Sequence, residues 1–382
     1  MNLLITPPYY PPHLGGLELA AERLALGMAK RGHNVHVVTS ESTGGSALID
    51  EPNVHRLPIV FKVFNTPISP AAYKAIRKLA EDADLIHTFG YPVFFSDISA
   101  RVAAERKIPL VLEWVMDPRR TKVYKENVVA RELTDMYFKI HGNSVFRRAG
   151  AIVLTCEDFR RYLERNQLIP SPGKLYVIPR AIDTKLFGPG PIRQDIRHDS
   201  EFLILYVGRI SEQKGLDILL RAFPGVLREY PNTCLVVIGP CDNANYWRRI
   251  EQYLSKCGGH VRFPFGTKGA PHSQLADYYR AADVVAFPSR YESRGMVPVE
   301  AMACGAPVVG TPVEGNEELI RQAGIAVPRD DSRALEEALK RLLSDPRLRE
   351  TLSRRGHELI SEEYDWEKNA DRYEAVYRAL AE

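Results

Sequence analysis

Short apolar runs alternate with helical stretches along the whole chain, and this alternation limits the possible folds more than any other property of the sequence. The first series of strand-like runs is NLLIT, NVHVVTS, DLIHTF, IPLVLEW, AIVLT and LYVIP. A second series follows with EFLILYVG, NTCLVVIG, HVRFPF, DVVAFPS, APVVGT and GIAVP. Strands and helices that alternate in this way predict α/β architecture with parallel, doubly wound sheets covered on both faces.

The stretches between the strands have the period of helices with one buried face. In GLELAAERLALGMAKRG, residues 16–32, apolar side chains recur on one face and Gly32 marks the end of the helix. In the second half, helices are expected near residues 215–229, 245–257, 273–281, 297–304 and 315–321.

The two series meet in a segment that has the composition of a linker. Residues 182–201, IDTKLFGPGPIRQDIRHDSE, contain two glycines and two prolines. A chain of 382 residues is long enough for two domains. We therefore expect one Rossmann-like domain over residues 1–185 and a second over 186–364. Ligands of open α/β sheets bind beyond the carboxyl ends of the strands, so two facing sheets would share an interdomain cleft.

Two loops of the second half combine charge with glycine. In YVGRISEQKG, residues 206–215, the chain turns at Gly208, and Arg209 and Lys214 flank this turn. Two cationic groups placed there would converge on one anion, and a surface loop with two ordinary cations is the alternative interpretation. In ESRGMVPVE, residues 292–300, the amides of 295–297 would point out of a helix start, where the helix dipole favours a phosphate.

These motifs together resemble the donor site of retaining glycosyltransferases of family 4, which have the GT-B fold. The resemblance rests on GRISEQKG and on the E-x7-E pair of Glu292 and Glu300, followed by AMACGAPVVGTPVEGNEELI. PPHLGGLELAAERLALGMAKRGHNVHVVT is similar to the Gly-Gly loop and first helix of the family, and DLIHTF and VIPRAIDTKLF also fit its pattern. YDWEKNADRYEAVYRAL is similar to the C-terminal helix that crosses back onto the first domain, which the resemblance implies over residues 365–382.

The resemblance implies a role for each matching residue. Arg209 and Lys214 would bind the donor diphosphate and stabilise its growing negative charge without a metal. Glu300 would accept hydrogen bonds from both ribose hydroxyls, and Glu292 would contact hydroxyls of the transferred sugar. The expected catalytic residues are thus Arg209, Lys214 and Glu292. The expected donor-binding residues are Gly15, Gly16, Gly208, Arg294, Gly295, Met296, Val297 and Glu300.

The acceptor side departs from the family pattern. Val115 stands where the family often has the histidine of a Thr-x-His motif, so polarity on that side is expected from His87, Glu113 or Asp117. His87 is either a residue of the cleft or a satisfied core histidine. Arg294 replaces the usual Phe and adds a cation beside the sugar and the diphosphate.

The implied activity is that of a retaining, metal-independent glycosyltransferase. It would move a hexose-type sugar from a nucleotide-diphospho-sugar to a glycan or lipid-linked acceptor, with a UDP-sugar favoured over GDP- and ADP-sugars. A catalytically silent nucleotide-sugar-binding protein is the first alternative, because of Val115. An NAD-dependent dehydrogenase is the second, although neither half contains the G-x-G-x-x-G fingerprint.

Composition sets the broad class. The chain is 45% hydrophobic and 26% charged, as soluble globular proteins are, and it has no apolar run near the ~18 residues that span a bilayer. The N-terminus lacks signal-peptide features, and the five cysteines form no C-x-x-C pair, so we expect a cytoplasmic protein with reduced thiols. The histidines show no metal-ligand spacing, so no metal site is expected.

Basic charge gathers in the first half. Residues 1–180 carry 24 Lys and Arg against 18 Asp and Glu, and residues 119–148 alone carry eight against three. The latter segment also has an apolar face at helical spacing. It is interpreted as a helix docked on the core with a solvated basic side, or as a surface for peripheral contact with an anionic membrane. No basic stripe interleaved with aromatic residues is present, so no nucleic acid partner is expected.

Overall fold

The computed structural model describes residues 1–13, 16–41, 53–63, 66–91, 93–115, 128–141, 144–167, 172–241, 243–292 and 295–381. The chain divides into two compact units, one made of Met1–Arg180 with Glu367–Glu382 and the other of Ala181–Trp366. All five cysteines are free thiols.

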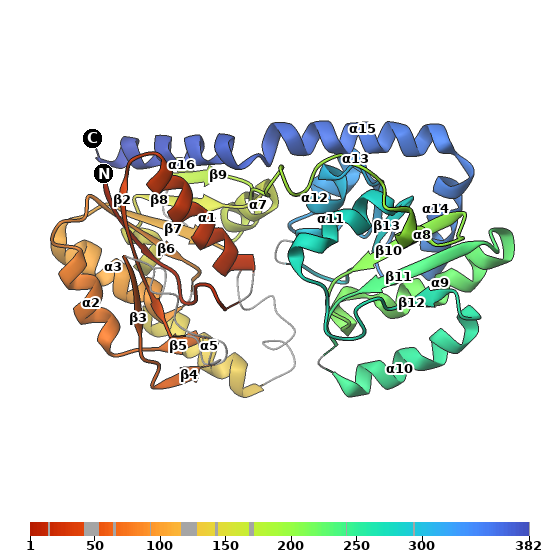
Figure 1. Ribbon diagram of the computed structural model, residues 1–382. Helices are drawn as coiled ribbons and strands as arrows, with labels where there is room; N and C mark the ends of the chain where they lie inside the picture. The colour runs from red at the N-terminus through yellow and green to blue at the C-terminus, as the bar shows by residue number, and fades with distance from the viewer. Residues whose placement is uncertain are drawn as a thin grey trace. The chain divides into compact units, whose positions relative to one another are not determined.

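The first unit is built on a seven-stranded, fully parallel sheet in the order β3-β2-β1-β6-β7-β8-β9 (Figure 1). Its strands are β1 (Asn2–Thr6), β2 (Asn34–Ser40), β3 (Val54–Leu57), β6 (Leu85–Phe89), β7 (Leu110–Trp114), β8 (Ala151–Leu154) and β9 (Leu175–Val177). An antiparallel pair, β4 (Phe61–Val63) with β5 (Thr66–Ile68), lies outside this sheet. The strand order reverses between β1 and β6, which makes this point the topological switch point of the sheet.

The helices of the first unit cover both faces of its sheet. They are α1 (Gly16–Lys30), α2 (Ala71–Leu79), α3 (Phe94–Arg106), α5 (Val128–His141), α6 (Ser144–Arg148), α7 (Glu157–Arg165) and α16 (Trp366–Ala381). Successive strand residues point to opposite faces. Ile86 and Leu112 therefore point into the core that includes α2, α3 and α6, while His87 and Glu113 point to the other face. That face is covered by the C-terminal helix α16, whose Tyr377 and Tyr373 contact His87 and Glu113 respectively.

The second unit has a six-stranded parallel sheet in the order β12-β11-β10-β13-β14-β15. Its strands are β10 (Phe202–Val207), β11 (Thr233–Ile238), β12 (Val261–Arg262), β13 (Val284–Phe287), β14 (Val308–Gly310) and β15 (Ile325–Ala326). Its helices are α8 (Gln194–Arg197), α9 (Leu216–Glu229), α10 (Ala244–Leu254), α11 (His272–Ala281), α12 (Val297–Ala303), α13 (Glu317–Ala323), α14 (Ser332–Ser344) and α15 (Pro346–Glu363). Short 3-10 turns occur at Pro172–Lys174, Glu212–Lys214 and Ser255–Cys257.

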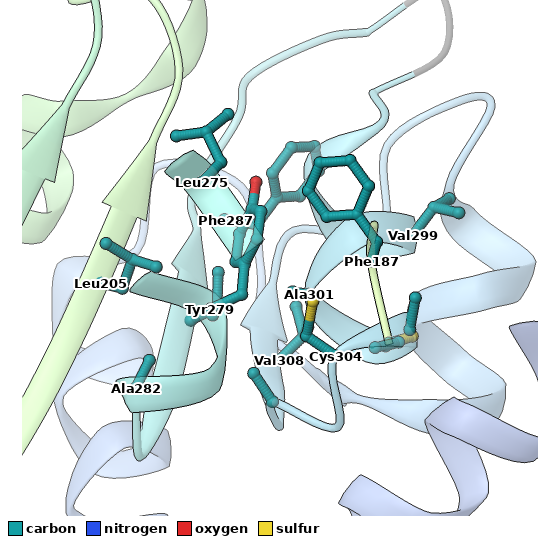
Figure 2. Close-up of a cluster of buried hydrophobic side chains, with 14 of the residues drawn as sticks. Phe187, Leu205, Leu275, Tyr279, Ala282, Phe287, Val299, Ala301, Cys304 and Val308 are labelled. Atoms are coloured by element: carbon teal, nitrogen blue, oxygen red, sulfur yellow. The ribbon is translucent and has the colours of Figure 1, made fainter. Parts of the chain in front are cut away.

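Two apolar cores, one on each face, hold this sheet. Leu205 and Phe287 lie on the face that packs against α11 and α12, where they meet Tyr279 and Val299 (Figure 2). Residues of alternate register, such as Ile204, lie on the face that packs against α9, α10 and α14. Strands buried on both faces explain why the sequence reads as continuous apolar runs. The predicted architecture of two doubly wound α/β domains is therefore confirmed.

Candidate active site

The expected donor residues lie at the topological switch point of the second unit. The strand order of this sheet reverses between β10 and β13, and ligands of open α/β sheets bind at such points. The loop after β10, residues 208–215, carries Arg209 and Lys214. The loop after β13, residues 288–296, carries Glu292.

Two glycines allow the backbone to pass closely in this region. Gly215 has φ +70°, and a Cβ on it would lie 2.1 Å from the carbonyl oxygen of Pro288. A Cβ on Gly239, at the end of β11, would lie 1.8 Å from the carbonyl oxygen of Gly208. Both distances are impossible for a larger residue, so glycine at 215 brings the start of α9 against the loop after β13.

Lys214 and Glu292 are paired with each other. The Lys214 ammonium donates to Glu292 Oε1, and Ser289 Oγ donates to the same oxygen at 2.9 Å. Glu292 is only 7% exposed. An ammonium has three donors and a carboxylate about four acceptor positions, so each group keeps capacity for a ligand.

Arg209 is the second cation of the site. Its side chain is exposed, and it makes no ion pair with any residue in the described part of the chain. Its backbone is fixed instead, because Tyr206 donates its hydroxyl to the Arg209 carbonyl oxygen at 3.1 Å. The guanidinium is therefore available for an anion.

Glu300 lies on α12 and has different partners from Glu292. Tyr279 donates its hydroxyl to Oε2 at 2.8 Å, and His272 Nε2 lies 3.0 Å from Oε1. Burial, and then the neighbouring carboxylate, raise the pKa of Tyr279 well above its ordinary value, so this hydroxyl stays protonated and donates. Pro298 lies in the first turn of the helix, as its preference for that position predicts.

Gly295 packs directly against the same group of residues. A Cβ there would lie 2.7 Å from Asn316 Nδ2 and 3.2 Å from Glu292 Cδ. Met296 and Val297, the other expected residues of this stretch, are partly buried against the core below. Arg294 lies outside the described residues.

The sequence interpretation missed several polar residues of this region. Asn316 is 1% exposed, and neither polar atom of its side chain has a hydrogen-bond partner among the described residues. Tyr279 and His272, the partners of Glu300, were missed as well. Asn316 lies in the stretch VEGNEELI, which contributes to the family resemblance. That resemblance does not indicate what the Asn316 side chain contacts, so the sequence alone gave no reason to include it in the site.

In the first unit, Gly16 begins α1 at the switch point between β1 and β6. A Cβ on Gly16 would lie 3.1 Å from Arg180 Nη1, so a larger residue would crowd this arginine. Gly15 and Asp117 lie outside the described residues. Val115, which follows β7, is partly buried.

His87 and Glu113 are buried beneath α16. They are 0% and 1% exposed, and His87 Nδ1 lies 2.6 Å from the Tyr377 hydroxyl. Tyr373 donates its hydroxyl to Glu113 Oε2 at 2.9 Å. Burial lowers the pKa of His87 to about 3. Burial also raises the pKa of Glu113, and this effect exceeds the opposite effect of the positive charge on Arg180. This packing gives both residues a structural role, and their acceptor-side role stays a prediction.

Among the described residues, no three His, Cys, Asp or Glu side chains are placed to hold a metal ion.

Two family models match the chain. The model described as "Glycosyltransferase Family 4" matches residues 14–186. The model described as "Glycosyl transferases group 1" matches residues 191–359. A D-inositol 3-phosphate glycosyltransferase of Catenulispora acidiphila is 34% identical over 57% of this chain and 56% of that protein. The chain thus spans about half the length of this curated relative. The uncharacterized glycosyltransferase MJ1607 of Methanocaldococcus jannaschii is 28% identical over 100% of this chain and 99% of its own length.

Solved structures with the same fold cover the entire chain. Sucrose-phosphate synthase of Thermosynechococcus elongatus has a TM-score of 0.76 at 24% identity, covering 100% of this chain and 99% of its own. Alr3699/HepE of Anabaena, solved in complex with UDP, has a TM-score of 0.80 at 19% identity and covers 99% of this chain and 100% of its own. The solved structures show the GT-B fold. The two family models, which together match residues 14–186 and 191–359, show that the chain belongs to the group 1 glycosyl transferases of family 4.

Proposed function

We propose that this chain transfers a hexose-type sugar from a nucleotide-diphospho-sugar to a glycan or lipid-linked acceptor, with retention of the anomeric configuration and without a metal. The observation that carries the proposal is that Lys214 pairs with Glu292 across the two loops at the switch point of the second sheet, and that Arg209 lies on the same loop as Lys214. This is the position where an open α/β sheet binds its ligand.

The cations would act on the leaving group. Cleavage of the bond between the sugar and the diphosphate leaves an additional negative charge on the diphosphate. Arg209, which has no competing carboxylate among the described residues, and Lys214, which keeps two of its three ammonium donors, can both stabilise that charge. Side chains alone supply this stabilisation, so the proposal requires no metal.

The two carboxylates would orient different parts of the donor. Glu300 is held by Tyr279 through Oε2 and by His272 through Oε1, and the one lone pair left on each oxygen suits one of two ribose hydroxyls. Glu292 is held by Lys214 and Ser289 through Oε1, which leaves Oε2 for a hydroxyl of the transferred sugar. The Lys214–Glu292 pair would thereby connect the diphosphate side of the donor with its sugar side.

A UDP-sugar is the favoured donor. Alr3699/HepE, which shares the fold, has been solved with UDP and with UDP-glucose. UDP, GDP and ADP should therefore be compared by thermal shift on the purified protein. A ligand at 100 times its dissociation constant adds about 2.7 kcal/mol to the stability of the protein that binds it.

Two matched substitutions test the division of roles. Glu300→Gln should weaken binding of the free nucleoside diphosphate, whereas Glu292→Gln should reduce turnover and leave nucleotide affinity nearly unchanged. Equal losses in both variants would refute this division of roles.

Turnover should also survive excess EDTA. Loss of turnover in EDTA, with rescue by magnesium or manganese, would refute the metal-free mechanism. Tight nucleotide binding without any turnover would favour the alternative of a catalytically silent binding protein.

We further propose that the first unit makes a peripheral contact with anionic membrane on the cytoplasmic side. Helix α5 exposes an apolar row: Val128 is 60%, Val129 66%, Leu133 40% and Met136 52% exposed. These four side chains are therefore not docked on the core, contrary to one of the two interpretations of this segment. Tyr137 does dock, because it packs on the core and donates its hydroxyl to Asp97. None of the helices in the described ranges is long and apolar enough to cross a bilayer.

A further inference from the structure

The two loops of the candidate site are connected by more than the Lys214–Glu292 pair. Arg290, two residues before Glu292, reaches across to the first turn of α9. Its Nη1 lies 2.9 Å from Asp217 Oδ1 and its Nη2 lies 2.8 Å from Asp217 Oδ2. Such a two-point pairing of guanidinium and carboxylate fixes orientation as well as distance.

Three hydrogen bonds to backbone carbonyl oxygens also join these two loops. Arg290 N donates to the Gln213 carbonyl oxygen at 2.8 Å. Gln213 Nε2 donates to the Tyr291 carbonyl oxygen at 3.1 Å, and Arg290 Nη1 donates to the Glu212 carbonyl oxygen. These partners lie one or two residues before Lys214 and Glu292 in the chain, so the contacts fix the backbone from which both side chains extend.

Asp217 is itself held in place from a third element. It is 6% exposed, and Tyr246 of α10 donates its hydroxyl to Asp217 Oδ1 at 2.8 Å. The Asp217 amide in turn donates to the Tyr246 oxygen at 3.2 Å. Burial acts to raise the pKa of Asp217, but the hydrogen bonds from Arg290 and Tyr246 outweigh it and lower this pKa. Asp217 is therefore a charged, fixed anchor.

We propose that Arg290 and Asp217 form a positioning clamp that sets the placement of Lys214 relative to Glu292 and so controls turnover of the donor. This inference rests on the proposed function. Arg290 is a positioning residue, because its guanidinium is occupied by Asp217, Asp330 and the Glu212 carbonyl oxygen and is not free for a ligand.

Lysine cannot replace this arginine. Its single ammonium lacks the planar fork that contacts two carboxylate oxygens, a second carboxylate and a carbonyl oxygen at once. Arg290→Lys keeps the charge and most of the side-chain volume, so it tests geometry with little change in net electrostatics.

The chain offers a matched control in the same unit. Arg197 Nη2 lies 2.8 Å from Asp283 Oδ2, the two side chains are 18% and 17% exposed, and Arg197 also donates to the Ala281 carbonyl oxygen. This pair lies at the amino ends of β10 and β13, away from the loops of the site. Arg197→Lys therefore weakens a comparable ion pair without touching the clamp.

The first test measures the kinetics of Arg290→Lys with a sugar donor that carries the nucleotide selected by thermal shift. We expect kcat to fall at least tenfold while the dissociation constant of the free nucleoside diphosphate changes less than threefold. In a Lys214→Ala background the same substitution should reduce kcat less than twofold further, because it acts through Lys214. Arg197→Lys should stay within twofold of wild type. A kcat of Arg290→Lys within twofold of wild type, effects that multiply in the double variant, or an equal loss in Arg197→Lys would each overturn the clamp.

Hydrogen exchange supplies a readout that does not depend on activity. Arg290→Lys should speed amide exchange in peptides covering 208–217 and 287–292 at least fivefold and leave the peptides of β11 and α14 unchanged. Unchanged exchange in both loops would overturn the clamp. If wild type turned over none of the donors, the proposed function would fail, and the exchange result would still decide whether the loops are clamped.

Discussion

At the scale of single residues, Lys214 and Glu292 form one unit, and a substitution at either position affects both. Lys214→Ala should lower donor turnover at least about tenfold, because a lost charge-assisted contact to a desolvated phosphate costs about 1.5–3 kcal/mol. It also leaves Glu292 buried with Ser289 as the remaining partner of Oε1. The double variant Lys214→Ala/Glu292→Gln should therefore lose less turnover than the product of the single losses.

Steady-state kinetics of the four proteins in this cycle check the prediction. Lys340→Ala is the matched control, since Lys340 pairs with Glu336 on α14 at 2.9 Å, far along the chain from the site. Kinetics unchanged by Lys214→Ala would remove this lysine from the site.

His87 gives the first unit a specific sensitivity to acid. Burial lowers its pKa to about 3 in the folded protein, whereas an unfolded histidine titrates near its ordinary value of 6.5. Between these values the unfolded state binds more protons, so the free energy of unfolding decreases as the pH falls below 6.5. The loss is about 2 kcal/mol by pH 5. Glu113 acts in the opposite direction, because its raised pKa favours the folded state when the carboxyl is protonated.

Urea unfolding of wild type and His87→Asn at pH 7 and pH 5 separates the two groups. The difference between the proteins isolates the histidine, and wild type should lose more stability than the variant on acidification. Equal losses in both proteins would show that His87 is not a buried neutral histidine.

The sequence and its family resemblance nominated the charged residues of the candidate site, but they could not predict the partners of these residues. Glu292 and Glu300 were nominated by the E-x7-E pair that resembles the family pattern. That spacing does not show that Lys214 pairs with Glu292 or that Tyr279 donates to Glu300. Such contacts join residues far apart in the chain, and they depend on helix placement, which a local pattern does not contain.

At the scale of elements, the apolar period predicted helices well and strand lengths less well. The helices expected near 215–229 and 273–281 are found as Leu216–Glu229 and His272–Ala281. HVRFPF and GIAVP give strands of only two residues, β12 and β15, which form the two edges of the sheet and pair on one side only. For α5, the period identified an apolar face correctly, yet periodicity does not show what covers that face.

The C-terminal helix α16 should be required for the first unit to fold. It supplies the hydroxyl partners of His87 and Glu113, and Leu380 packs against Gly150. Arg31, just after α1, adds ion pairs to three acidic residues of α16. Ending the chain after Asp365 removes both hydroxyl partners and exposes the sheet face on which His87 and Glu113 lie.

Calorimetry can follow this truncation. One unfolding transition should disappear or fall by more than about 10 °C, and the transition of the second unit should remain. Removing only residues 381–382 is the control and should change neither transition. A first unit that unfolds at its original temperature after the truncation would contradict the role assigned to α16.

At the scale of the whole molecule, each unit has a complete sheet, its own cores and its own switch point, so repetition of one sequence pattern was sufficient to predict the architecture. Charge is divided less evenly, since residues 1–180 carry an excess of basic residues and the rest of the chain an excess of acidic ones. The basic unit is also the one that exposes the apolar row of α5. An anionic membrane surface attracts basic residues, and exposed apolar side chains insert into its headgroup region.

The membrane contact can be tested by co-sedimentation with vesicles. The protein should pellet with vesicles that contain phosphatidylglycerol, remain in solution with neutral phosphatidylcholine vesicles, and be released by salt, because screening shortens the range of charge attraction. Each basic residue near such a surface contributes about 1 kcal/mol, and the apolar row adds insertion into the headgroup region. Leu133→Asp should therefore abolish pelleting. Ile192→Asp, at a residue of the second unit that is 51% exposed, is the matched control and should have no effect. Equal, negligible pelleting with neutral and anionic vesicles at low salt would exclude this contact and favour a soluble acceptor.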